Sequence, residues 1–244
     1  MLVGLQKTTL VNFPGRVAAA VFLPGCNLSC PYCHNTELVK ASVKGSELKS
    51  SGNNYYTIDE VYSFLGKRKN ILSGLVISGG EPFISPVIFD LIRKAKELNL
   101  AVKIDTNGTQ PDKLLKVLNS TELRPSMIAL DIKTSLKRYE EVLPKSAKDN
   151  FSGIVQRILK TIEILVKDGI ETEYRTVLIP GFVDKSEIEE IASVLPKNAV
   201  WKLANFVPGN CLNPDWNNIK PYTEKEIKDI TNLALTFIKN TEFR

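Results

Sequence analysis

Short apolar segments alternate with amphipathic helical segments along the chain, and this alternation constrains the fold more than any other feature. Six segments have the length and composition of buried strands: 17–23, 74–78, 101–105, 127–133, 171–178 and 199–206. Six others have the pattern of helices: 57–67, 85–99, 111–119, 152–168, 184–195 and 223–239. Strands that alternate with helices are joined by right-handed crossovers and form a parallel sheet. The sequence therefore predicts an α/β fold in one domain over residues 1–244.

Local signals place several element boundaries. Thr57 and Thr223 are each followed three residues later by a glutamate, which is the spacing of a capping box at a helix start. Ser85 precedes a proline, which is favoured at the first helical position, so a helix is expected to begin there. Residues 36–56 are polar and contain several glycines and asparagines, which indicates a long loop inserted at the surface.

The composition is that of an ordinary soluble globular protein, with 43% hydrophobic and 24% charged residues. The net charge of +5 is spread along the chain, which fits an acidic ligand or partner surface better than nucleic acid. No window approaches the roughly 18 apolar residues of a membrane span, and the N-terminal segment lacks a secretory pattern. The clustering of most cysteines in one loop argues against a disulfide framework. We therefore expect a cytoplasmic protein that binds neither nucleic acid nor membranes.

Polar clusters follow the first four predicted strands at their carboxyl ends. They are the cysteine-containing loop 26–35 and the segments 79–82, 105–108 and 131–133. The carboxyl ends of parallel strands meet at one edge of a sheet, where α/β folds build their functional sites. We therefore expect these segments to contribute to one site.

Cys26, Cys30 and Cys33 lie within eight residues. A lone buried cysteine is commonly an inert small hydrophobe, but three at this spacing indicate soft-metal ligands for zinc or an iron–sulfur cluster. Structural zinc requires four protein ligands, and the other candidates are poorly spaced, because His34 adjoins the third cysteine and Cys211 is distant. With three thiolates, a four-iron cluster would keep one iron open for another ligand.

The cysteine spacing, with Tyr32 before the third cysteine and Gly-Gly-Glu-Pro at 79–82, resembles the radical S-adenosylmethionine (radical SAM) superfamily. In that superfamily the three cysteines hold a 4Fe-4S cluster, and S-adenosylmethionine chelates the open iron through its amino and carboxylate groups. The reduced cluster passes one electron to the sulfonium, which yields methionine and a 5′-deoxyadenosyl radical. The resemblance implies a partial (β/α)6 barrel with Cys26, Cys30 and Cys33 as metal ligands.

The same resemblance assigns cofactor contacts to the other strand ends. The Gly-Gly-Glu sequence would receive the amino group of S-adenosylmethionine, although its ordinary role is a tight turn. The segments containing Asp105 and Asp131 would contact the cofactor and a monovalent cation beside its carboxylate, where an Asx-type turn and a solvated charge pair are the ordinary alternatives. The expected cofactor-binding residues are Tyr32, Gly79, Gly80, Glu81, Asp105, Thr106, Asn107, Asp131, Lys133, Arg175 and Asn205.

A narrower resemblance follows from the string Tyr-Cys-His-Asn at 32–35, which is similar to activating enzymes of glycyl radical enzymes. The segments 4–35, 175–181 and 205–211 resemble the anaerobic ribonucleoside-triphosphate reductase activating proteins. This implies an oxidoreductase that takes a hydrogen atom from a glycine loop of a partner glycyl radical enzyme. Its electron would come from a donor such as flavodoxin or ferredoxin. No residue acts as a catalytic acid or base, because the cofactors carry the chemistry.

Two other functions fit the same residues. The chain could be a radical SAM enzyme acting on a small molecule, such as a 7-carboxy-7-deazaguanine synthase, or a non-catalytic iron–sulfur electron-transfer module. His34 is more often a structural hydrogen-bonding residue than a ligand, although its position also suits a contact beside the cluster. Cys211 is interpreted as a small loop residue, and an ion pair is the ordinary role for Arg175.

Overall fold

The computed structural model describes residues 1–45, 48 and 55–244. The chain forms two compact units that are interleaved in sequence. The first unit comprises Met1–Asn27, Glu37–Thr106 and Asp112–Ile128, and the second comprises Leu28–Thr36, Asn107–Pro111 and Ala129–Arg244. That the whole chain is one domain stays a prediction.

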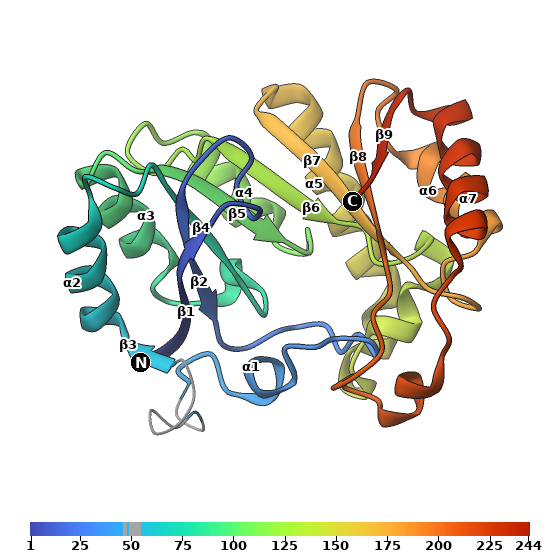
Figure 1. Ribbon diagram of the computed structural model, residues 1–244, viewed down its shortest axis with the longest axis horizontal. Coiled ribbons are helices and arrows are strands. Elements are labelled where there is room, and N and C mark those ends of the chain that lie inside the picture. Colours follow the sequence, from blue (N-terminus) through green and yellow to red (C-terminus); the bar gives the residue numbers. More distant parts are fainter. Residues whose placement is uncertain (46–47, 49–54) are drawn as a thin grey trace. The chain divides into compact units, whose positions relative to one another are not determined.

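The first unit contains strands in the order β3-β1-β2-β4-β5 (Figure 1). In that order their bounds are Tyr55–Thr57, Leu2–Thr9, Ala18–Leu23, Gly74–Gly79 and Ala101–Thr106. As predicted, β2, β4 and β5 pair in parallel, with Ala20 aligned with Val76 and Val76 with Lys103. β1 pairs antiparallel with both β2 and β3. Sequence patterns do not predict β1 and β3, because β1 ends in a polar stretch and β3 has only three residues.

The helices of the first unit follow one capping signal and depart from another. Their bounds are Thr36–Lys40 for α1, Ile58–Arg68 for α2, Pro82–Ile84 for the 3-10 helix η1, Ile88–Glu97 for α3 and Pro111–Leu118 for α4. The predicted capping box is confirmed, because the Thr57 hydroxyl accepts from the Glu60 N–H at 3.2 Å and the Glu60 carboxylate accepts from the Thr57 N–H at 2.7 Å. The predicted helix start at Ser85 is wrong. Ser85 instead ends η1, donating its N–H to the Pro82 carbonyl, so that α3 begins at Ile88.

The segment 36–56, predicted as a polar surface loop, contains more structure than expected. It begins with α1, whose Leu38 is buried in a cluster with Ala41 and Leu48, and it ends in β3. The glycines and asparagines that suggested a loop lie mostly at 46–47 and 49–54, outside the described residues.

The second unit contains strands in the order β6-β7-β8-β9, and β6 begins in the last residues of the first unit. Their bounds are Met127–Asp131, Glu171–Leu178, Val200–Asn205 and Asn240–Phe243. β8 pairs in parallel with both β7 and β9. Its helices are η2 Leu136–Val142, η3 Lys145–Asn150, α5 Phe151–Asp168, α6 Lys185–Val194, η4 Pro214–Asn218 and α7 Glu224–Phe237. The sequence predicts a last helix to about residue 239, but α7 ends earlier because the following residues add β9 to the sheet.

One face of β7, β8 and β9 carries a row of charged residues. Arg175 is aligned with Lys202, and Lys202 with Glu242. Side chains alternate between faces along a strand, and the opposite face of β8 carries the buried Trp201 and Leu203. Charged side chains contribute little to a core, so this face of the three strands lies outside the hydrophobic core.

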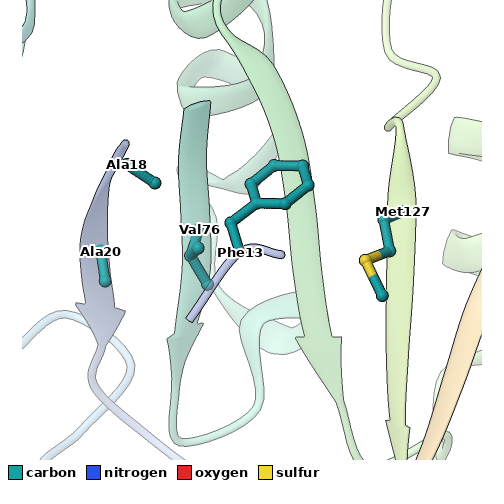
Figure 2. Close-up of a cluster of buried hydrophobic side chains, with 5 residues drawn as sticks. All are labelled: Phe13, Ala18, Ala20, Val76 and Met127. Carbon is teal, nitrogen blue, oxygen red and sulfur yellow. The ribbon is translucent and has the colours of Figure 1, made fainter. Parts of the chain in front are cut away.

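Phe13, in the connection between β1 and β2, covers the amino ends of strands in the first unit. It is 3% exposed and packs against Ala18 and Ala20 of β2, Val76 of β4 and Met127 of β6 (Figure 2). Burying such an aromatic side chain stabilises the fold by roughly 1.5–3 kcal/mol. Because Phe13 fills this end of the unit, the carboxyl ends of the strands are left for a site.

The predicted α/β class with parallel strands is confirmed by the alternation of β4 to β8 with helices. Among the described residues, no helix is both long enough and apolar enough to cross a membrane.

Candidate cofactor site

The two glycines after β4 are required by a close approach of backbone. Gly79 has a φ of +114°, and a Cβ there would lie 2.3 Å from the nitrogen of Leu23. A Cβ at Gly80 would lie 1.8 Å from the carbonyl oxygen of Gly25. The Gly80 N–H donates to the Leu23 carbonyl at 2.8 Å, and the Glu81 N–H donates to the Gly25 carbonyl at 2.9 Å. The end of β4 is thus joined to the start of the cysteine-containing loop.

Glu81 joins two predicted site segments within the first unit. Its side chain is fully buried, and Oε1 accepts from the hydroxyl of Thr106 at 2.8 Å and from the N–H of Phe83 at 3.1 Å. The second bond caps η1. A buried carboxylate is stable only when it is hydrogen-bonded in this way. Glu81 and Thr106, both predicted to contact the cofactor, therefore hold the ends of β4 and β5 together.

Asp105 is paired with a buried lysine that the sequence patterns do not single out. Lys103 Nζ lies 2.9 Å from Asp105 Oδ1 and donates to the carbonyl of Asn12 at 2.9 Å. The lysine side chain is 0% exposed and that of Asp105 is 11% exposed. The two residues are two positions apart on β5 and so lie on the same face of the sheet.

The cysteine-containing loop begins in the first unit with Cys26, which is half-buried. Cys30 and Cys33 lie in the second unit, where the Cys33 N–H donates to the Cys30 carbonyl at 3.0 Å and forms a tight turn. The Leu212 N–H donates to the Cys33 carbonyl at 3.0 Å, so the segment after Cys211 supports this turn. Burial raises the pKa of the Cys33 thiol.

Tyr32 belongs to an aromatic cluster in the second unit. Its ring centroid lies 5.8 Å from that of Phe182 and 5.9 Å from that of Trp216. Its hydroxyl donates to the carbonyl of Lys133 at 3.4 Å. Burial raises the pKa of Tyr32 well above its usual value, so the hydroxyl stays protonated. Sequence reasoning missed Phe182 and Trp216, because no local pattern shows which aromatic residues converge.

Asp131, Lys133 and Arg175 form an ion-pair network in the second unit. Arg175 Nε lies 2.6 Å from Asp131 Oδ1, and Lys133 Nζ lies 2.9 Å from Asp131 Oδ2. Burial raises the pKa of Asp131, but the two cations outweigh it and hold that pKa well below its usual range. Lys133 is further positioned through its N–H, which donates to the hydroxyl of the buried Tyr139 at 3.0 Å. The ion pair named as the ordinary role of Arg175 is thus present, and the assignment of these three residues to the cofactor stays a prediction.

A cavity of about 310 Å³ opens beside this network within the second unit. It is lined by Tyr32, Asp131, Ile132, Lys133, Arg175, Thr176, Val177, Lys202, Leu203, Ala204 and Arg244. Its volume is in the range of small-molecule sites, and its cations favour an anionic ligand. The side chain of Glu173 is 1% exposed, and its Oε1 lies 3.5 Å from Nη1 of Arg244 and 3.8 Å from Nη1 of Arg175. Sequence reasoning missed Lys202 and Arg244, which are brought to the cavity by strand register and by the unpredicted β9. It also missed Glu173, which contacts two of the arginines that line the cavity.

Two predicted contacts have structural roles within the second unit. Asn107 Oδ1 accepts from the N–H of Thr109 at 3.1 Å and from its hydroxyl at 2.6 Å, which is the Asx-type turn considered as the ordinary alternative. Asn205 Nδ2 donates to the carbonyl of Tyr222 at 3.2 Å. The exposed His34 stacks on Phe206, with ring centroids 6.4 Å apart.

Among the described residues, no group of three or more His, Cys, Asp or Glu side chains is arranged to hold a metal ion. The chemistry of the donor set nevertheless suits an iron–sulfur cluster, because soft thiolates at this spacing lie in a loop fixed by backbone hydrogen bonds. The assignment of Cys26, Cys30 and Cys33 as cluster ligands stays a prediction.

Comparison with known proteins adds to this geometry. A candidate glycyl-radical enzyme activating enzyme of Methanocaldococcus jannaschii is 27% identical over 242 residues, covering 99% of this chain and 94% of that protein. The pyruvate formate-lyase-activating enzyme of Clostridium pasteurianum is 27% identical over 197 residues, covering 78% of this chain and 74% of that enzyme.

The structure of Streptococcus suis SuiB bound to S-adenosylmethionine has the same fold, with a TM-score of 0.62 at 16% identity. That match covers 91% of this chain but 48% of SuiB, so the chain spans about half of SuiB. The family model described as the radical SAM superfamily matches residues 20–195, which is most of the chain. Membership implies a 4Fe-4S cluster and S-adenosylmethionine as cofactors. The predicted fold type is therefore confirmed, and the chain belongs to the radical SAM superfamily.

Proposed function

We propose that this protein is a radical SAM activase that removes a hydrogen atom from a backbone glycine of a partner glycyl radical enzyme. The partner is an anaerobic ribonucleoside-triphosphate reductase. The observation that carries the activase proposal is the similarity of nearly the whole chain, 99% of it, to a candidate activating enzyme. The choice of reductase rests on the resemblance of segments 4–35, 175–181 and 205–211.

The cofactor-binding residues divide by chemistry. Thiolates of Cys26, Cys30 and Cys33 would hold the cluster. With bound S-adenosylmethionine, the cluster would supply the one-electron chemistry that cleaves the sulfonium and yields the radical that takes the glycine hydrogen. A flavodoxin or ferredoxin in the cytoplasm supplies the electron. The remaining contacts are the strand-end residues Gly79, Gly80, Glu81, Asp105, Thr106, Asn107, Asp131, Lys133, Arg175 and Asn205, together with Tyr32.

The residues of the chain itself bind and orient S-adenosylmethionine and exclude water from the site. Arg175 and Lys133, held by Asp131 at 2.6 and 2.9 Å, present fixed positive charge to a carboxylate. The aromatic cluster of Tyr32, Phe182 and Trp216 provides an apolar surface beside the cavity. No proton transfer by a side chain is required, which agrees with the high pKa of Tyr32.

Two anaerobic assays test the proposal with reconstituted protein. Reduction with dithionite in the presence of S-adenosylmethionine is expected to produce 5′-deoxyadenosine, and mixing with an anaerobic ribonucleotide reductase is expected to produce the electron paramagnetic resonance doublet of a glycyl radical. A Cys30→Ala variant is expected to do neither.

The two assays also separate the alternatives. Production of 5′-deoxyadenosine without a glycyl radical on any tested reductase would overturn the activase proposal in favour of a small-molecule substrate. Absence of 5′-deoxyadenosine from a fully loaded protein would indicate a non-catalytic iron–sulfur module.

A further inference from the structure

The resemblance to activating enzymes predicts a monovalent cation held by Asp105 and Asp131 beside the carboxylate of S-adenosylmethionine. Such a cation binds where carboxylate oxygens carry negative charge that nothing else compensates. The contacts of the two aspartates, each within its own unit, show whether this condition is met.

Asp105 has an ammonium group within hydrogen-bond distance. Lys103 Nζ lies 2.9 Å from Asp105 Oδ1, so this oxygen already has a positively charged partner. The Nζ also donates to the carbonyl of Asn12 at 2.9 Å, which supplies a second oxygen of the kind that coordinates alkali cations. The lysine ammonium thus contacts a carboxylate oxygen and a carbonyl oxygen at once.

The fold keeps Lys103 in this place. The residue is aligned with Val76 in the middle of the parallel sheet, and its side chain is 0% exposed. Asn12 is next to Phe13, whose ring packs on Val76 and Met127 (Figure 2), so the carbonyl that accepts from Lys103 is anchored. A buried ammonium without partners would strongly destabilise the fold. Lys103 therefore keeps its contacts with Asp105 and Asn12.

The negative charge of Asp131, in the second unit, is likewise compensated by cationic side chains. Its Oδ1 pairs with Arg175 at 2.6 Å and its Oδ2 pairs with Lys133 at 2.9 Å. Both aspartates that would coordinate an alkali cation therefore already face cationic side chains of this chain.

We infer that Lys103 supplies, beside Asp105, the positive charge that the family resemblance assigns to a monovalent cation, and that this protein binds S-adenosylmethionine without an alkali cation. Lys103 acts as a positioning residue for Asp105. The inference rests on the proposed placement of the S-adenosylmethionine carboxylate near Asp105.

Cation replacement in the unaltered protein is the first test. Cluster-loaded protein is exchanged into sodium, potassium or choline chloride at equal ionic strength, and the Kd of S-adenosylmethionine is measured anaerobically by equilibrium dialysis. The inference expects the same Kd, within about twofold, in all three salts. A loss of tenfold or more in choline that sodium or potassium restores would overturn it.

Substitutions of the lysine are the second test. Lys103→Met is expected to weaken S-adenosylmethionine binding in choline by on the order of tenfold or more, and potassium or sodium is expected to restore part of the loss. Lys103→Arg keeps the charge and is expected to stay independent of alkali cations. Lys228→Met, at an exposed position on α7, is the matched control. A folded Lys103→Met protein that binds in choline as tightly as the unaltered protein would overturn the inference.

The line width of the ²³Na magnetic resonance signal gives a readout that needs no turnover. Sodium is expected to show specific broadening with Lys103→Met and none with the unaltered protein, and the reverse would overturn the inference. Because this measurement and the Kd do not depend on hydrogen abstraction, a protein that fails to activate any reductase contradicts the proposed function without deciding the role of Lys103.

Discussion

Arg175 on β7 donates from Nε to Oδ1 of Asp131 at the end of β6 over 2.6 Å, and both side chains are about a quarter exposed. Removing one partner of an ion pair at this depth destabilises the protein more than removing one partner of a surface pair, because the remaining charge is left poorly solvated. The pair lines the cavity proposed to receive part of S-adenosylmethionine.

Replacement of Arg175 by alanine is expected to weaken S-adenosylmethionine binding about tenfold or more and to lower the free energy of unfolding by about 1–3 kcal/mol. Equilibrium dialysis and urea denaturation measure the two effects. Arg68→Ala at an exposed position of α2 is the control and is expected to change neither. Unchanged binding by Arg175→Ala would remove this residue from the proposed site.

The pH dependence of stability is expected to carry the signature of Asp131. Its native pKa lies well below its usual range, so its stabilising contribution is complete above the unfolded pKa of about 3.9 and is lost as pH falls towards the native value. The difference in unfolding free energy between the unaltered protein and Asp131→Asn should therefore shrink as pH falls from about 5 to 3. Urea denaturation at several pH values in this range measures the difference in unfolding free energy. A difference that stays constant with pH would show that ionisation of Asp131 does not stabilise the fold.

Gly80→Ala is expected to displace the start of the cysteine-containing loop, because the new Cβ would lie 1.8 Å from the Gly25 carbonyl oxygen. The expected cost is about 1–3 kcal/mol or more, with reduced iron content after reconstitution. Gly66→Ala in α2 is the matched control, since apart from its chain neighbours and the backbone of its own helix no atom lies within 4 Å of the new Cβ. This variant should stabilise the protein by about 0.5–1 kcal/mol. Equal behaviour of the two variants would contradict the close approach.

Glu81→Ala is expected to destabilise the protein by about 1–3 kcal/mol, because the Thr106 hydroxyl and the Phe83 N–H lose a buried acceptor. Glu81→Gln keeps a carbonyl oxygen and should cost less. A double-mutant cycle with Thr106→Val measures the coupling between the two residues by urea denaturation. Additive effects of the two substitutions would show that the hydrogen bond from Thr106 to Glu81, at 2.8 Å, contributes nothing to stability.

Much of the fold was predictable because its signals are local. The capping box of Thr57 and the alternation of apolar strands with helices depend on residues near one another in sequence. The start of α3 was mispredicted although Ser85 and its proline are also a local signal. There the side chain of Glu81 caps the start of η1, and Ser85 caps its end after the last residue Ile84. The strand β9 was missed because four residues acquire strand structure only by pairing with β8.

The sequence by itself determined the chemistry of this protein, because thiolates at a given spacing and polar residues after apolar strands are properties of neighbouring positions. Only the tertiary structure decided which charges meet. Lys103 reads as an ordinary strand residue until the sheet and the Phe13 segment bury it against Asp105 and Asn12. Lys202 and Arg244 likewise reach the cavity through strand register. Electrostatic interactions depend on distance and burial in space, which the order of residues along the chain does not reveal.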